Sequence, residues 1–265
     1  AAAASTAAFG HDVAGRTFGW RQPLGLLAVG AVVVGVIPAL FTLTDGAWFA
    51  PRQSMVDAIE AQLPTTEQVG DYRVLYLGDP RLIPFPSQDL GDGVAMAVVD
   101  DGPADFRDRW AAPHQDADAA LRTVIEQIAT QDTRRGGRLL APFGIRSIVV
   151  PVVDGATSTA QDPLPLPAGL VDALAAQLDL ARAPTVTSVI RFDNRSAIPT
   201  TAALSGDVAT ASRRESPDAA VAVDTATATP VLPGADTTRR VAGDVPEGVV
   251  HLATPLDEHW ELTVG

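Results

Sequence analysis

The chain is 265 residues long, carries a formal net charge of −13 and contains no cysteine. The absence of cysteine excludes a disulfide framework, a thiolate nucleophile and any cysteine-ligated metal. Residues 1–44 hold two arginines and one aspartate, so residues 45–265 hold 17 arginines against 31 acidic residues, a net charge of −14. Such an acidic region should repel nucleic acid and anionic lipid, and we therefore expect no nucleic-acid partner.

An uncharged run of 23 residues lies between Arg21 and Asp45, and its core at 24–41 is almost wholly apolar. A bilayer core of about 30 Å needs about 20 helical residues, so we expect a transmembrane helix over 22–44. Arginine on the N-terminal flank marks that side as cytoplasmic. We therefore interpret 1–21 as a cytoplasmic flank or inter-helix loop and expect the residues after about 45 to be extracytoplasmic at the cell membrane. A signal-peptide core and a buried helix of a soluble protein are the alternatives.

Helical and strand patterns alternate through residues 45–204, which predicts a layered extracytoplasmic α/β domain. Apolar or β-branched runs predict strands at 73–77, 94–99, 145–153 and 185–192. One-sided apolar spacing predicts helices at 53–63, 116–131 and 170–178, with one further helical turn at 138–143. The strand at 145–153 is apolar apart from Arg146 and Ser147, so we expect it to be central in the sheet.

The composition changes after about residue 200. Residues 205–246 are rich in Ala, Thr, Asp and Gly, which is typical of a linker or an irregular β segment. Residues 247–265 contain two predicted strands, 249–253 and 260–264, and we interpret them as the start of a truncated, sandwich-like β-module. The chain begins without methionine and ends directly after the second of these strands. We therefore expect it to be a fragment of a longer protein with further membrane helices upstream.

The turn Gly78-Asp79-Pro80-Arg81 follows the first predicted strand, which is a common ligand position in α/β sheets. A carboxylate beside a guanidinium can hold a polar ligand such as a sugar. Asp79 and Arg81 are therefore our candidate substrate-binding residues. The alternative is a capped turn with a surface ion pair.

Other polar residues give weaker signals. Asp100 and Asp101 could bind a divalent metal, but they also form an ordinary Asp-Asp-Gly turn. No histidine pair has metal-ligand spacing, and the sequence has no P-loop, G-x-G-x-x-G or G-x-S-x-G motif. We therefore predict no catalytic residue, no metal site and no cofactor in this chain. The basic cluster of Arg134, Arg135 and Arg138 is interpreted as cations that oppose a helix dipole, with contact to a lipid phosphate as the alternative.

Five segments resemble, in their order, the C-terminal part of large actinobacterial polytopic membrane glycosyltransferases of the family 2 type. They are FGWRQPL (18–24), YRVLYLGDPRLIP (72–84), LLAPFGIRSIVVP (139–151), LDLAR (178–182) and RFDNRSAIP (191–199). The resemblance implies a cytoplasmic nucleotide-sugar domain first, then many membrane helices, then an extracytoplasmic α/β and β region. The catalytic acidic motifs of that family belong to the upstream domain, so no residue of this chain inherits a catalytic role.

Two functional hypotheses follow. The first is a fragment of a membrane-embedded glycosyltransferase of cell-envelope polysaccharide synthesis, with the lipid bilayer and an acceptor glycan or lipid-linked sugar as its partners. The second is a membrane-anchored extracytoplasmic glycan-binding or structural module without catalysis.

Overall fold

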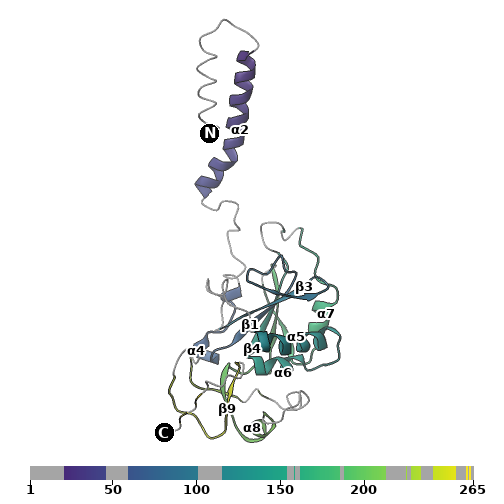
Figure 1. Ribbon diagram of the computed structural model, residues 1–265, viewed down its shortest axis with the longest axis vertical. Helices are drawn as coiled ribbons and strands as arrows, with labels where there is room; N and C mark the ends of the chain where they lie inside the picture. The colour runs from purple at the N-terminus through teal and green to yellow at the C-terminus, as the bar shows by residue number, and fades with distance from the viewer. Residues whose placement is uncertain are drawn as a thin grey trace. The chain divides into compact units, whose positions relative to one another are not determined.

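The computed structural model describes residues 21–45, 59–100, 115–153, 158, 162–185, 188–212, 225, 228–233, 241–254, 261 and 263. The chain divides into two compact units, Ala1–Arg52 and Gln53–Gly265, and each is described by itself (Figure 1). Most of the predicted helix at 53–63 and of the predicted strand at 260–264 lies outside the described residues.

The first unit contains helix α2 (Arg21–Asp45). Its large aliphatic side chains are exposed rather than packed: Leu24, Leu26, Leu27, Val29, Val32, Val33, Val34, Val36 and Ile37. Consecutive residues point in different directions around a helix, so apolar surface faces outward on every side. Among the residues that the structure describes, no helix is long and apolar enough to cross a membrane. The segment predicted at 22–44 is helical, and its crossing of a membrane stays a prediction.

The second unit is built on a six-stranded mixed sheet. Its strands lie in the order β2 (Gln88–Gly91), β3 (Val94–Val99), β1 (Arg73–Gly78), β4 (Ile145–Pro151), β6 (Val189–Asn194) and β5 (Leu180–Ala183). Strands β1 and β4 are parallel, and the other neighbouring strands are antiparallel. The predicted α/β class is confirmed, and β4 is a central strand as expected.

Helices cover one face of this sheet. They are α5 (Gln115–Ala129), α6 (Gly136–Leu140) with the 3-10 turn η2 (Ala141–Phe143), and α7 (Leu170–Ala175), which Figure 1 shows on the same side. Leu121, Ile125 and Ile128 lie on one stripe of α5 at helical spacing. They pack into a buried core with strand residues that include Leu75 and Ile148.

Among the described residues, the opposite face is covered in part by the segment that leads into β1. Tyr72, Val74 and Tyr76 form a second buried core there, together with Ile59 and Phe85. The short helix α4 (Thr66–Val69) belongs to this covering segment. Val74 and Tyr76 alternate along β1 with side chains that enter the helix-covered core, as the two-residue period of a strand requires. Both faces of β1 are therefore buried.

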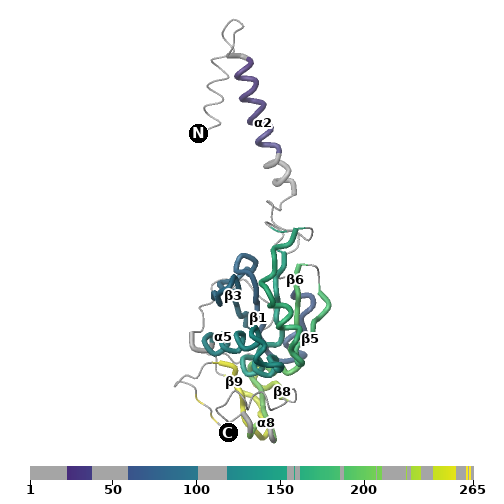
Figure 2. Tube along the Cα trace, turned by 90° about the vertical axis from the view of Figure 1, so that its right-hand side faces the viewer, coloured from purple at the N-terminus to yellow at the C-terminus, as the bar shows by residue number. Residues whose placement is uncertain are grey.

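A second, three-stranded antiparallel sheet has the order β8 (Thr229–Pro230), β7 (Thr201–Leu204) and β9 (Val249–Leu252). Helix α8 (Gly206–Ser212) follows β7, and Figure 2 shows β8, β9 and α8 together at one end of the unit. The described residues thus give a small antiparallel sheet after the α/β sheet. Its sandwich-like character stays a prediction, because one sheet alone is described here.

Candidate functional site

The predicted site residues Asp79 and Arg81 lie together in the turn that follows β1. The Asp79 carboxylate accepts a hydrogen bond from the backbone N–H of Arg81 at 2.9 Å. It also accepts bonds from Arg81 Nε at 3.0 Å and from Nη2 at 2.5 Å. The side chain of Asp79 is 12% exposed, whereas that of Arg81 is 65% exposed. The pair therefore has a nearly buried acid that holds an outward-facing cation.

This pairing decides which of the two groups can meet a ligand. Hydrogen bonds from the Arg81 side chain hold the pKa of the Asp79 carboxyl below its usual range, although burial opposes the shift. Asp79 is therefore ionised at neutral pH and cannot serve as a proton donor. The carboxylate fixes the orientation of Arg81, and the guanidinium remains accessible to an anionic group or to sugar hydroxyls.

The position of the turn in the sheet also suits a ligand. Strands β1 and β4 are parallel neighbours, so both end at the same edge. The chain then continues from β1 to β2 and β3 on one side, and from β4 to β5 and β6 on the other. Such a divergence between neighbouring parallel strands is where open α/β sheets commonly bind ligands. Asp79 and Arg81 lie at this point of divergence.

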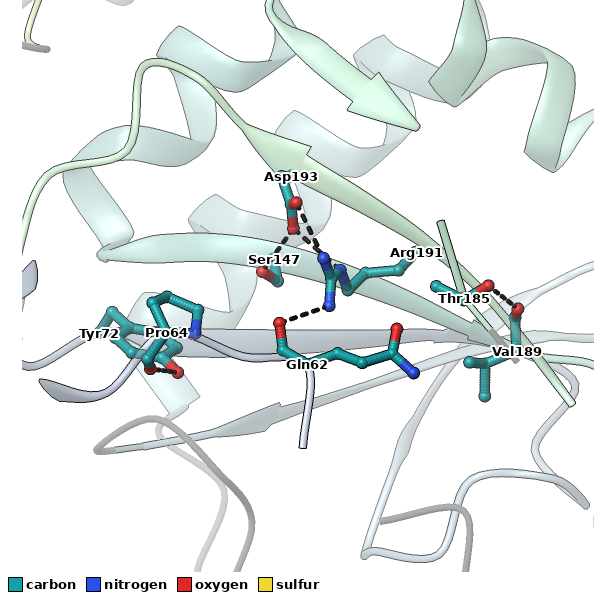
Figure 3. Close-up of polar contacts among 8 residues, drawn as sticks. All are labelled: Gln62, Pro64, Tyr72, Ser147, Thr185, Val189, Arg191 and Asp193. Carbon is teal, nitrogen blue, oxygen red and sulfur yellow. Dashed lines mark hydrogen bonds and ion pairs between the residues drawn. The ribbon is translucent and has the colours of Figure 1, made fainter. Parts of the chain in front are cut away.

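A second polar group, which we call the sheet-face cluster, consists of Ser147, Arg191, Asp193 and the Gln62 carbonyl (Figure 3). Ser147 Oγ donates to Asp193 Oδ1 at 3.0 Å. Arg191 contacts both oxygens of the same carboxylate at 3.1 Å, and its Nη1 donates to Gln62 O at 2.9 Å. Ser147 lies opposite Asp193 in the β4–β6 register, which places these side chains on one face of the sheet.

Two further side chains extend the cluster on the same face. The Tyr72 hydroxyl donates to Pro64 O at 2.7 Å, and the guanidinium carbon of Arg146 lies 5.7 Å from the Tyr72 ring centroid. Burial raises the pKa of Tyr72 to about 12, an increase that Arg146 and Arg191 partly offset. Burial also lowers the pKa of Arg146. Tyr72 is therefore protonated at neutral pH and acts as a hydrogen-bond donor.

The sheet-face cluster holds the chain together rather than providing a nucleophile. Ser147 is fully buried, and it donates its proton directly to a carboxylate that is already bound by an arginine. The bonds of Arg191 and Tyr72 end on the carbonyls of Gln62 and Pro64. These contacts fasten the 62–64 segment across the sheet. The polar interruption at Arg146 and Ser147 was visible in the sequence, but the partner of Ser147 on β6 and the contact of Arg146 with Tyr72 were not.

The other sequence candidates have structural partners. Asp100 forms an ion pair with Arg73, and Arg73 also donates to the carbonyls of Phe143 and Ala253. Nε2 of His251 lies 3.0 Å from Pro142 O, and burial lowers the pKa of this histidine. These contacts join β9 to the α/β sheet.

Some of the polar residues considered in the sequence analysis are not among the residues that the structure describes. Asp101 and the other three histidines lie outside the described residues. Within the part of the chain that the structure describes, no three acidic or histidine side chains gather as metal ligands.

Comparisons with known proteins give no relative, since no protein-family model, no curated protein and no solved structure matches the chain.

Proposed function

We propose that this chain is a fragment of a membrane-embedded glycosyltransferase of cell-envelope polysaccharide synthesis, with its nucleotide-sugar domain upstream. In this proposal α2 crosses the bilayer over 22–44, and the second unit is an extracytoplasmic α/β domain with a partial β-module. The observation that carries it is the surface of α2, where Leu26 is 75% and Leu27 is 70% exposed. A helix that is apolar on every side needs apolar surroundings, and a bilayer supplies them.

The glycosyltransferase part of the proposal is supported by the five resembling segments. Four of them build the second unit: 72–84 contains β1 and its turn, 139–151 contains β4, and 178–182 and 191–199 contain most of β5 and most of β6. The resemblance thus covers the framework of the sheet and not only a short motif. Its expected partners are a lipid-linked sugar or a growing glycan outside the membrane.

Within this function Arg81 contacts the acceptor. Its guanidinium is oriented by Asp79 and is largely exposed at the divergence between β1 and β4. Arginine presents several N–H donors in a fixed fork, which suits the hydroxyls of a sugar or the phosphate of a lipid carrier. Asp79 keeps the fork in place and does not itself contact the ligand.

The membrane topology can be tested with single cysteines because the chain has none of its own. Ala129 is exposed at the end of α5, and Ala8 lies in the predicted cytoplasmic flank. A membrane-impermeant maleimide should label Ala129→Cys on intact cells and should label Ala8→Cys only after permeabilisation. The reverse pattern, or release of the protein from membranes by alkaline carbonate, would contradict the proposed topology.

The transfer activity needs a second experiment with the full-length gene product in membrane vesicles. The assay measures sugar incorporation from nucleotide-sugars into polymer as the acceptor concentration varies. Arg81→Ala should raise the apparent KM for the acceptor by roughly tenfold, since hydrogen bonds to charged groups contribute about 1.5–3 kcal/mol. Arg122→Ala, which removes another arginine of the same unit, is the matched control and should leave KM unchanged. Acceptor binding without any sugar incorporation would instead favour the non-catalytic glycan-binding module.

A further inference from the structure

Two of the three arginines at 134–138 do not have the role that the sequence predicted for them. Arg135 is the N-cap residue of α6, which is the positive end of the helix dipole, so a cation there is not stabilised by the dipole. Helix α5 ends at Ala129, and the dipole effect fades within the last turn of a helix. Arg138 lies in the last turn of α6, as the dipole interpretation requires, but Arg134 and Arg135 are not placed to oppose a helix dipole.

Backbone hydrogen bonds bring these arginines next to two other segments. The N–H of Leu178 donates to Arg134 O at 2.9 Å, and the N–H of Arg195 donates to Asp179 O at 2.9 Å. Arg134, Arg135 and Arg195 are exposed. The side chain of Leu178, in the segment that contacts both Arg134 and Arg195 through its backbone, is 64% exposed. We call Arg134, Arg135, Leu178 and Arg195 the arginine–leucine patch.

The patch brings three exposed arginine side chains close to one buried carboxylate, that of Asp179. Asp179 is buried beneath it, and its carboxylate is occupied by the backbone N–H groups of Gly137 and Arg138 at 2.9 and 2.8 Å. Across the described ranges, no ion pair involves Arg134 or Arg195. Residues 45–265 as a whole carry a net charge of −14 and should repel anionic lipid, but the three arginines beside the exposed leucine make this patch locally cationic, which favours an anionic partner.

We propose that the arginine–leucine patch binds the surface of an anionic bilayer. Its guanidinium groups would contact lipid phosphates, and Leu178 would enter the interface between headgroups and acyl chains. An acidic polysaccharide would satisfy the arginines but not the exposed leucine. Sugar rings also commonly stack on aromatic side chains, and the patch contains none. The inference rests on the proposed function only in that a membrane is present.

The test uses the whole chain, reconstituted through α2 into vesicles of phosphatidylcholine alone or with increasing phosphatidylglycerol. Leu178→Cys carries an environment-sensitive NBD dye, and Ala129→Cys carries the same dye as a matched control. The Leu178 probe should shift to the blue and be quenched by spin-labelled lipid as phosphatidylglycerol rises, whereas the Ala129 probe should not. High salt should weaken the response, since it screens exposed charges.

Charge variants decide whether the patch itself is responsible. Each arginine near an anionic surface contributes about fivefold to partitioning, so Arg134→Ala, Arg135→Ala and Arg195→Ala combined should abolish the response. The corresponding triple lysine variant should retain most of it. Circular dichroism of both triple variants should match that of the parent chain.

Three outcomes would overturn the inference. They are an unchanged Leu178 probe at all phosphatidylglycerol contents, an equal response in the triple alanine variant, and a response to soluble acidic polysaccharide but not to vesicles. Flotation separates this failure from that of the proposed function. A chain that floats with neutral vesicles but shows no probe response leaves membrane anchoring intact, whereas a chain that does not float contradicts the anchoring.

Discussion

Replacing Gly137 with alanine should strongly destabilise the second unit, although helix propensity alone predicts the opposite. In an exposed helix interior, alanine is about 1 kcal/mol more favourable than glycine. At Gly137, however, an added Cβ would lie 2.8 Å from Asp179 Cγ and closer still to Asn194 Oδ1. The backbone of Gly137 is held at this position from both sides, because its N–H donates to Asp179 and its carbonyl accepts from Asn194.

The expected magnitude follows from the bonds that must break. To make room for the methyl group, Asn194 would give up the bonds of its Nδ2 to Gly137 O and Ile145 O, and the bond that its Oδ1 accepts from Ser196 N. Three buried hydrogen bonds at about 1 kcal/mol each amount to roughly 3 kcal/mol. This loss exceeds the gain in helix propensity, so we expect a net destabilisation of about 2–3 kcal/mol.

The assay is urea unfolding of the chain in mild detergent, followed by circular dichroism. With a slope of about 2 kcal/mol/M, the midpoint should fall by about 1–1.5 M. A double-mutant cycle with Asn194→Ala tests the cause, because the closest contact of the added Cβ, with Asn194 Oδ1, disappears when the amide is absent and only the contact with Asp179 remains. Gly137→Ala should then cost much less in the Asn194→Ala background than in the parent chain. A Gly137→Ala variant as stable as the parent would refute this reasoning.

Three other substitutions test the remaining contacts. Asp79→Asn removes a carboxylate whose pKa is lowered by Arg81. This carboxylate stabilises the fold above its ordinary pKa of about 3.9 and stabilises it less as the pH falls. The melting temperature of the variant should therefore fall less below pH 4 than that of the parent chain. Arg191→Met leaves Asp193 without its cation and should lower the free energy of unfolding in urea by about 2 kcal/mol. The loss is smaller than for a fully buried pair because the Asp193 side chain is partly exposed. Adding Asp193→Leu should recover part of the loss. Gly144→Ala places a side chain at φ +73° and 2.8 Å from a threonine methyl, so it should cost about 2 kcal/mol and speed amide hydrogen exchange in β7 and β9.

The long, regular elements of the second unit could be predicted from the sequence. Strand β3 lies where the apolar run at 94–99 placed it, and α5 (Gln115–Ala129) overlaps the predicted 116–131. Hydrophobic periodicity identifies such elements because their burial is one-sided or complete. The turn with Asp79 and Arg81 was also located correctly, since the Gly-Asp-Pro sequence both ends the strand and fixes the turn.

The sheet edge and the sheet-face cluster could not be predicted in the same way. Strand β5 (Leu180–Ala183) has the sequence LARA, which has no β-branched residue and follows directly on the predicted helix at 170–178. Its extended form comes from pairing with β6 (Val189–Asn194), which also begins later than the predicted 185–192. The contact between Ser147 and Asp193 depends on strand register across 46 positions, and no local pattern encodes that register.

Three of the five resembling segments meet in one buried network, and their resemblance therefore reflects packing at least as much as function. Asp179 of LDLAR binds the backbone N–H of Gly137, and Asn194 of RFDNRSAIP donates to Gly137 O and to Ile145 O within LLAPFGIRSIVVP. Buried polar groups of this kind tolerate few substitutions because each lost partner leaves another group unsatisfied. The resemblance therefore reports mainly on how α6, β4, β5 and β6 are joined. A chain could keep all of these residues and lose the contact of Arg81 with an acceptor, so the proposed function has to be tested at Arg81 and at the membrane.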